Sequence, residues 1–414
     1  MQNDIRANRS ATKIRQPKID ISNFQTPEEI ASHDALNQTE QSSPTNNPLI
    51  YTHPIQKTKK KYWPPTKKQL LVSGLIAVFI IALGLVAWSL TRTSHHSTKP
   101  VIALKQPTKK PVLAPKTVPS TLTGLAVAPS VNQRPITAVM IENTPYARPQ
   151  AGLSQAGVIF EALTEGGITR FMALYQNQLP SNVGPIRSAR PYFLDWDLGF
   201  DAPLAHVGGS PLALAEIPEL GVKNLDYLDY PNYYHRISSR PAPHNVYTSL
   251  SDLMNLEAKL GWTSSNYSGW PRKPDAPAAN PNATTINFNP SYSTYNVSYS
   301  YNKKTDSYER SEGGAPQIGA NTHQQIDPKV VIGMIVPWSQ GPLDTSDAYY
   351  SVYQTIGQGQ AYVFQDGTVT IGQWNKASAQ APLTFTTDNN QPLKLNAGQT
   401  WITVLASKNQ INYQ

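Results

Sequence analysis

The most prominent feature of the sequence pattern is a single long apolar run near the N-terminus. Residues 70–90 contain no charged side chain, and a helix of that length, rising about 1.5 Å per residue, spans a hydrocarbon core of roughly 30 Å. Six lysines lie between residues 57 and 68, whereas only Arg92, Lys99 and Lys105 follow the run closely. Because positive charge marks the cytoplasmic side of a span, we predict a single transmembrane helix over 69–91 in the cell membrane. The N-terminus is then cytoplasmic and the rest of the chain extracytoplasmic.

The segments that flank this run have compositions typical of extended chain. Residues 1–56 are rich in Asn, Gln, Thr, Ser and Pro, and no helical or alternating period persists there. We therefore predict a disordered cytoplasmic tail over 1–68. Residues 92–120 place repeated prolines among lysines, a pattern that favours a stiff, extended tether. Such a tether would hold the following residues away from the bilayer.

Beyond the tether, short apolar runs alternate with helical patterns up to residue 265. A Thr-Glu-Gly-Gly sequence between two of the runs is a hairpin signal, and Ser249 followed by Asp252 is typical of a helix start. This mixture predicts an α+β unit over 121–265. The predicted strands cover 136–141, 158–163 and 169–175, and the predicted helices cover 188–198, 211–217 and 249–260.

The last third of the chain has a different pattern. Residues 266–284 are rich in Pro, Asn and Ala, which predicts a linker, and from 285 to 410 nearly every segment alternates with period two. Asp366-Gly367 between two such segments indicates a tight hairpin. We therefore predict a smaller antiparallel β-rich domain over 285–410.

Composition and charge exclude several classes of protein. The chain has no Cys, which excludes disulfides, a zinc-thiolate site, a cysteine nucleophile and a lipidated N-terminal cysteine. The net charge of +8 belongs to the flanks of the apolar run, since residues 118–414 hold 18 basic and 21 acidic side chains. Nucleic-acid binding needs a basic surface, so no nucleic-acid partner is expected.

Candidate chemistry concentrates in the α+β unit. Between residues 118 and 222 every basic side chain is Arg and none is Lys, and a guanidinium binds carboxylate or phosphate with two parallel hydrogen bonds. One interpretation is an anion-binding cleft; the other is a buried network in which these Arg and Glu side chains neutralise one another. The candidate ligand-binding residues are Glu161, Glu165, Arg170, Arg187, Arg190, His206, Ser210, His244 and Asn245.

Other chemical roles have weaker support. His206 ends an apolar strand beside a Gly-Gly loop, where it could act as a general base or simply precede a turn. Ser210 does not lie in a G-x-S-x-G elbow. The spacings of His206, His235 and His244 match no recognised metal-ligand pattern, so we expect no metal and no cofactor.

Several long segments carry a resemblance to a known family. They are 134–143, 147–150, 161–171, 183–190, 206–211 and 242–248, followed by 363–367, 372–376 and 397–402. These segments resemble the YerB-like family of extracytoplasmic bacterial proteins of unassigned function. The resemblance covers about residues 118–410 and implies a three-layer sandwich of two sheets and helices for the first unit and a β-rich second unit. It implies no reaction and no catalytic residue. Many relatives are anchored through a lipidated cysteine, a role that the transmembrane helix would take here.

Three hypotheses of function follow. The first is a non-enzymatic, membrane-tethered envelope module that binds an anionic cell-wall component or a wall-synthesis partner through the Arg, Glu and His side chains. The second is a wall-polymer hydrolase or transferase that uses Glu161 or Glu165 with His206 or His244. The third is a structural interaction protein that uses its β domain.

Overall fold

The computed structural model describes residues 116–414 except 343–348. The predicted tail, the predicted transmembrane helix and all but the end of the predicted tether lie outside these residues. Within the described ranges, no helix combines the length and the apolar character needed to cross a membrane.

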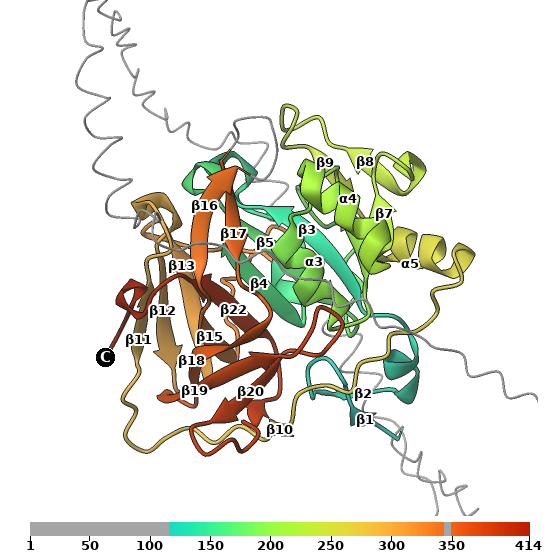
Figure 1. Ribbon diagram of the computed structural model, residues 1–414. Coiled ribbons are helices and arrows are strands. Elements are labelled where there is room, and N and C mark those ends of the chain that lie inside the picture. The colour runs from blue at the N-terminus through green and yellow to red at the C-terminus, as the bar shows by residue number, and fades with distance from the viewer. Residues whose placement is uncertain (1–115, 343–348) are drawn as a thin grey trace, which may run out of the picture. The chain divides into compact units, whose positions relative to one another are not determined.

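A ten-stranded mixed sheet forms the centre of the described body (Figure 1). Its two halves come from the two segments that flank the predicted linker, and they join where β4 (Val158–Leu163) pairs in parallel with β22 (Thr400–Leu405). The predicted β-rich segment therefore supplies half of the central sheet, so its strands are not confined to a separate domain. The spatial order is β20 (Thr384–Thr387), β19 (Thr368–Lys376), β18 (Gly357–Gln365), β15 (Val330–Ile335), β22 (Thr400–Leu405), β4 (Val158–Leu163), β5 (Thr169–Tyr175), β3 (Thr137–Glu142), β6 (Pro203–His206) and β7 (Lys223–Asp226).

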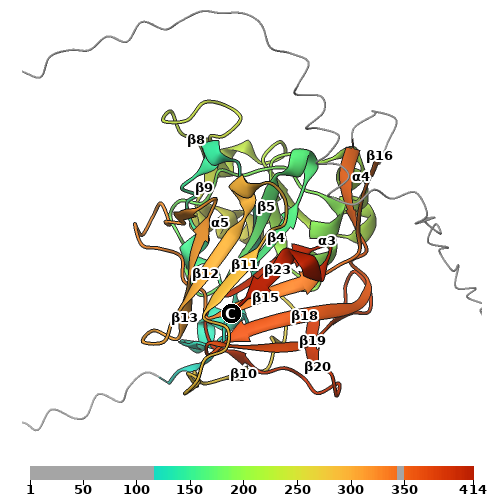
Figure 2. The same cartoon turned by 90° about the vertical axis from the view of Figure 1, so that its left-hand side faces the viewer.

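A smaller antiparallel sheet comes entirely from the C-terminal segment (Figure 2). Its apolar positions alternate with polar ones, because one face packs inward while the other faces solvent. Ile286, Phe288 and Tyr299 are fully buried on the inner face. The strand order is β14 (Ala315–Pro316), β13 (Ser307–Glu312), β12 (Val297–Asn302), β11 (Thr285–Phe288) and β23 (Ile411–Tyr413).

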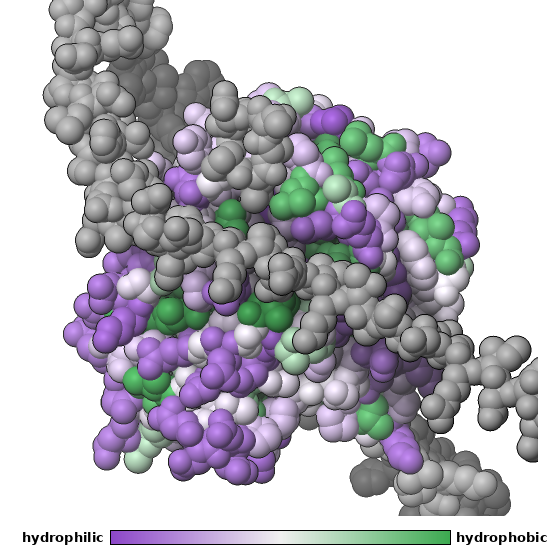
Figure 3. Space-filling view, in the orientation of Figure 1, coloured by the Kyte–Doolittle hydropathy of each residue, from purple (hydrophilic) through white to green (hydrophobic). Residues whose placement is uncertain are grey.

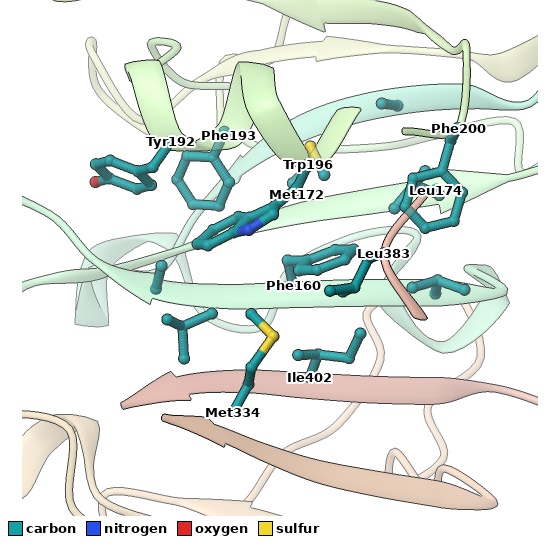
Figure 4. Packing of buried hydrophobic residues seen from close by; sticks show 14 of the residues in the cluster. Phe160, Met172, Leu174, Tyr192, Phe193, Trp196, Phe200, Met334, Leu383 and Ile402 are labelled. Atoms are coloured by element: carbon teal, nitrogen blue, oxygen red, sulfur yellow. The ribbon is translucent and has the colours of Figure 1, made fainter. Parts of the chain in front are cut away.

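Three helices complete the described body. Side chains of α3 (Pro191–Leu198) and α4 (Pro211–Leu220) share one core cluster with one face of the central sheet. Figure 4 shows Trp196 of α3 beside Phe160 of β4, and their stacked rings lie 5.3 Å apart. α5 (Leu250–Lys259) shares a second cluster with the opposite face and with the smaller sheet. The three layers implied by the family resemblance are present, but the second sheet comes from residues after the linker.

Four two-stranded pairs lie outside the two sheets. The strand β10 (Arg272–Lys273) belongs to the segment predicted as a linker. Part of this segment is packed, since Trp270 is buried and its indole Nε1 donates to the Leu383 carbonyl at 2.7 Å, whereas most residues from 274 to 280 are exposed. The prolines of this segment lack a backbone N–H donor. The segment is nevertheless held against the rest of the body by the contacts of its other residues. The pairs are β1 (Val118–Pro119) with β2 (Ala126–Val127), β8 (Tyr234–Arg236) with β9 (Val246–Thr248), β10 (Arg272–Lys273) with β21 (Leu395–Asn396), and β16 (Trp338–Pro342) with β17 (Tyr349–Tyr353).

Local sequence signals explain where several elements begin and end. The Ser249 hydroxyl accepts from the Asp252 amide at 3.0 Å and caps α5, and Gly261 follows with φ of +80°. Asp366 and Gly367 both have positive φ, as a type I′ hairpin requires. The helix predicted from residue 188 begins later, at Pro191, because the preceding backbone is extended and Ala189 bridges to Gly209. Arg187 therefore lies outside the first helical turn.

On the coloured part of the face in Figure 3, apolar residues form small, separate groups among polar ones. Scattered apolar side chains of this kind are ordinary for a protein surface. Among the larger exposed ones are Tyr146, Leu228 and Tyr349. Chemistry on this body is therefore to be sought in its polar clusters.

Candidate functional site

The arginine site lies where β3 and its parallel neighbours β6 and β7 end. An extended segment, residues 186–190, crosses this edge and is held by backbone hydrogen bonds on both sides. The Arg187 amide donates to the Met140 carbonyl at 3.0 Å, and the Val207 amide donates to the Arg187 carbonyl at 3.1 Å. The carboxyl ends of parallel strands are a recurrent place for ligand sites. We use the name arginine site for Glu142, Glu165, Arg170, Arg187, Arg190 and His244.

Glu142, the last residue of β3, is the centre of this site. It is 1% exposed, and one carboxylate oxygen, Oε1, accepts three hydrogen bonds. The donors are Thr144 Oγ1 at 2.7 Å, His244 Nδ1 at 2.7 Å and Arg187 Nη2 at 3.0 Å. The other oxygen, Oε2, is buried without a partner among the described residues.

His244 reaches Glu142 from the loop between β8 and β9. Because a carboxylate only accepts, the imidazole donates its Nδ1 proton to Glu142. The other ring nitrogen, Nε2, then has no hydrogen-bond partner among the described residues. The His244 side chain is 18% exposed, and the ring of Tyr146 lies over it at 5.6 Å between centroids. A carboxylate that orients an accessible imidazole is the arrangement that general acid–base chemistry uses.

Arg190 and Glu165 form a second pair at the same edge. Arg190 donates to both Glu165 oxygens, from Nε at 2.5 Å and from Nη2 at 2.7 Å. Burial opposes ionisation of Glu165, but the hydrogen bond and charge of Arg190 outweigh it and lower the pKa of this carboxyl. The ring of Tyr350 lies 5.9 Å from the Arg190 guanidinium. This pair is bidentate and electrically neutral.

Arg170 differs from its neighbours because it has no carboxylate partner. It stands opposite Glu142 in the β3–β5 ladder, and its Nη1 donates to the Ser188 carbonyl at 2.8 Å. Within the described part of the chain, no carboxylate lies within ion-pair distance of it. Burial, together with the nearby charge of Arg190, lowers the pKa of Arg170 to about 10. Arg170 therefore carries a positive charge in a partly buried place with no direct counter-charge.

Glu161 lies elsewhere, in the interior between the two sheets. It is fully buried and binds Arg310 Nη2 at 2.8 Å and the Trp401 indole at 3.1 Å. Arg310 is also fully buried and lies 4.2 Å from the Trp401 ring centroid. Glu161 therefore belongs to a buried ion-pair network, but its partner Arg310 is not one of the arginines between residues 118 and 222 for which such a network was considered. Glu161 does not reach the arginine site.

Three further candidates have structural partners of their own. Buried His206 directs Nδ1 to the Gly208 carbonyl at 2.8 Å and Nε2 to Asn224 Oδ1 at 2.7 Å. The Ser210 hydroxyl caps α4 by accepting from the Ala213 amide at 3.3 Å. Asn245 accepts a hydrogen bond from the Arg236 guanidinium at 2.6 Å.

Of the nine candidates, the structure gathers Glu165, Arg170, Arg187, Arg190 and His244. Glu142 was not among the candidates predicted from the sequence, although it is the last residue of an apolar strand, β3, whereas Glu161 lies within β4. A carboxyl at the end of an apolar run is a signal that could have found it, but that signal does not tell which partners a buried carboxyl binds, and both Glu142 and Glu161 are buried. Among the residues that the structure describes, no three His, Asp or Glu side chains are placed to hold a metal ion.

Comparison with known proteins agrees with the resemblance seen in the sequence. Residues 122–263 match the model described as "Protein of unknown function (DUF3048) N-terminal domain", and residues 285–402 match its C-terminal counterpart. The chain is 31% identical over 294 residues to the Bacillus subtilis protein named "Putative lipoprotein YerB", covering 70% of this chain and 87% of that protein. The crystal structure of YerB from Bacillus subtilis is similar, with a TM-score of 0.63 and 28% identity over 72% of this chain and 99% of that chain. The chain therefore belongs to the YerB-like family, whose two DUF3048 domains have no assigned function.

Proposed function

We propose that this protein is a membrane-anchored extracytoplasmic protein of the cell envelope that binds an anionic cell-wall component, or an anionic group on a wall-synthesis partner, at the arginine site. The location is supported by the apolar run at 70–90 and by the name of the YerB relative, which classes that protein as a lipoprotein. Because this chain has no Cys, its anchor is the apolar run and not a lipid.

The observation that carries the proposal is that Arg170 forms no ion pair among the described residues, although Arg187 and Arg190 each do. In the arginine site three guanidinium groups face two carboxylates, and both carboxylates are already engaged by Arg187 and Arg190. A charge held partly out of water without a partner is costly. An anionic ligand would supply the missing counter-charge, and the guanidinium fork suits a carboxylate or a phosphate.

The sharpest test removes the Arg170 charge alone. Arg170→Gln leaves no carboxylate orphaned and keeps an amide that can donate to the Ser188 carbonyl, so the free energy of unfolding should change little. Affinity of the full-length protein for an anionic wall polymer such as poly(glycerol phosphate) should fall about tenfold, or about 1.4 kcal/mol. Titration calorimetry at a fixed salt concentration measures this, with thermal unfolding as the check on folding.

Arg134→Gln is the matched control. Arg134 belongs to the same unit and donates to the Asn177 carbonyl, outside the arginine site. Both variants lose one positive charge, so any general electrostatic attraction of the polymer falls equally in both. Equal affinities of the two variants would contradict the proposal. A double change at Arg187 and Arg190 is less informative, because it would leave Glu142 and Glu165 without their cationic partners.

A second candidate function, hydrolysis of a wall polymer, is favoured by the Glu142–His244 pair. Glu161 and His206 are buried, so this hypothesis now depends on His244. In such a reaction His244 Nε2 would take a proton from water as the water oxygen forms its bond to phosphorus or carbonyl carbon. The same proton would pass to the leaving oxygen as its bond breaks.

If the protein hydrolyses the polymer, a change at His244 should lower the rate of hydrolysis much more than it lowers the affinity for the polymer. His244→Gln should keep polymer affinity within about twofold, while the rate of fragment release falls about a hundredfold. His235→Gln, a change at an exposed histidine on β8, is the control and should match the wild-type rate. Mass spectrometry of the polymer after incubation reports the products. If the wild-type protein releases no fragments, the second candidate is wrong and the binding proposal is unaffected.

A further inference from the structure

The outer face of the smaller sheet carries an open hollow lined by amide and hydroxyl side chains. Its volume is about 470 Å³, which lies within the range of small-ligand sites. Figure 2 shows β11, β12, β13 and β23 of this sheet side by side. The lining residues are Asn287, Asn289, Asn296, Val297, Ser298, Gly314, Asn412 and Gln414. We call this the asparagine hollow.

Strand register builds the centre of the hollow. Asn287 of β11 is directly opposite Asn412 of β23 on one side and Ser298 of β12 on the other. Adjacent strands lie about 4.8 Å apart, so these three side chains form a row across the sheet. Their sequence neighbours Ile286 and Tyr299 point the opposite way, into the core. The row is therefore held in place by the same packing that forms the sheet.

Among the described residues, the side chains of the row form no hydrogen bonds that stabilise the fold. Within the described part of the chain, Asn287, Ser298 and Asn412 have no side-chain hydrogen bond that joins them to another residue. Asn296 Oδ1, at the rim, is buried and also has no hydrogen-bond partner there. A buried acceptor without a partner is unfavourable, and a ligand donor at this point would offset that cost.

The chemistry of the lining selects an uncharged ligand rich in hydroxyl and amide groups. No ionisable side chain lines the hollow, which disfavours phosphates, carboxylates and nucleic acids. Each Asn offers both donors and an acceptor, and a sugar hydroxyl likewise both donates and accepts. An extended peptide would instead pair with a strand edge and use apolar pockets. The occupant that fits is a neutral polysaccharide with acetamido and hydroxyl groups.

We propose that the asparagine hollow binds a neutral, N-acetylated glycan strand. This site is separate from the arginine site, and it requires neither an anion nor catalysis. A chain with both sites would bind the neutral and the charged parts of an envelope polymer with two different sets of residues. The row on β11, β12 and β23 supplies the direct contacts, and Asn296 supplies a further acceptor at the rim.

Titration of the full-length protein with a neutral oligomer of β-1,4-linked N-acetylglucosamine tests this proposal. The double change Asn287→Ala with Asn412→Ala should weaken binding at least tenfold, because two contacts are lost. Ser300→Ala is the matched control, since Ser300 is an exposed residue of β12 opposite Thr285 that does not line the hollow. Thermal unfolding should be unchanged in all three proteins.

The outcomes separate this site from the arginine site. The Arg170→Gln variant should bind the neutral oligomer as tightly as the wild type does. This result is expected whether or not the variant loses affinity for the anionic polymer, so the proposed function can fail while the glycan proposal stands. The glycan proposal is overturned if the wild-type protein does not bind the oligomer. It is likewise overturned if the double variant and Ser300→Ala bind equally well, or if sedimentation shows that a second copy of the chain covers this face.

Discussion

At the scale of single residues, Glu257 links the stability of the body to pH. This α5 carboxyl is fully buried, accepts one hydrogen bond from Thr137 Oγ1 at 2.7 Å and has its second oxygen unpartnered among the described residues. Burial raises its pKa to about 7. The folded state therefore holds a proton that the unfolded state releases near pH 4.5, so stability should fall as pH rises from about 5 through 7.

Glu257→Gln should remove this pH dependence. The amide is uncharged at every pH, so the variant should be more stable than the wild type at pH 8, by up to about 3 kcal/mol. At pH 4, where the wild-type carboxyl is protonated in both states, the two proteins should differ little. Thermal unfolding at both pH values measures the effect. Glu219→Gln on the exposed side of α4 is the control, and a variant that only tracks this control would contradict the prediction.

Two similar carboxyls show the limit of sequence analysis at this scale. Glu142 and Glu161 each occur at or near the end of an apolar strand, so the sequence gives them the same signal. Their surroundings separate them: His244 comes to Glu142 from 102 positions away, and Trp401 comes to Glu161 from 240 positions away. Residue type and local spacing predict that a carboxyl is buried, but the identity of its partners is a property of the assembled fold.

At the scale of elements, features set by neighbouring residues could be predicted. β4 and β5 match the predicted ranges, and Asp366-Gly367 forms the expected hairpin, because alternation and turn chemistry act over a few residues. The start of α3 was predicted three residues too early, since its true limit is set by the Ala189–Gly209 bridge to another segment. The packing of part of the Pro-rich linker was missed for the same reason: Trp270 and Arg272 bind residues more than a hundred positions away.

At the scale of the whole molecule, β4 is the element that most depends on distant sequence. Its side chains are buried on both faces of the central sheet, with Phe160 in one core and Ile159 in the other. Its parallel partner β22 belongs to the C-terminal segment, which also supplies the sheet that covers the second core. The two segments that the family models separate are therefore parts of one folding unit in this body.

Deletion of residues 284–414 tests this interdependence. The remaining protein would expose β4 as an apolar edge strand and would leave Glu161 without Arg310 and Trp401, so it should lack cooperative thermal unfolding and should aggregate. Co-expression with the missing segment should restore a soluble complex that unfolds cooperatively. If the truncated protein instead unfolds cooperatively by itself, the central sheet does not require its C-terminal half.

Because the same deletion also disrupts the edge that holds Arg170, loss of partner binding after it would not assign that binding to the smaller sheet. Single changes in the arginine site and in the asparagine hollow are needed to separate the two surfaces.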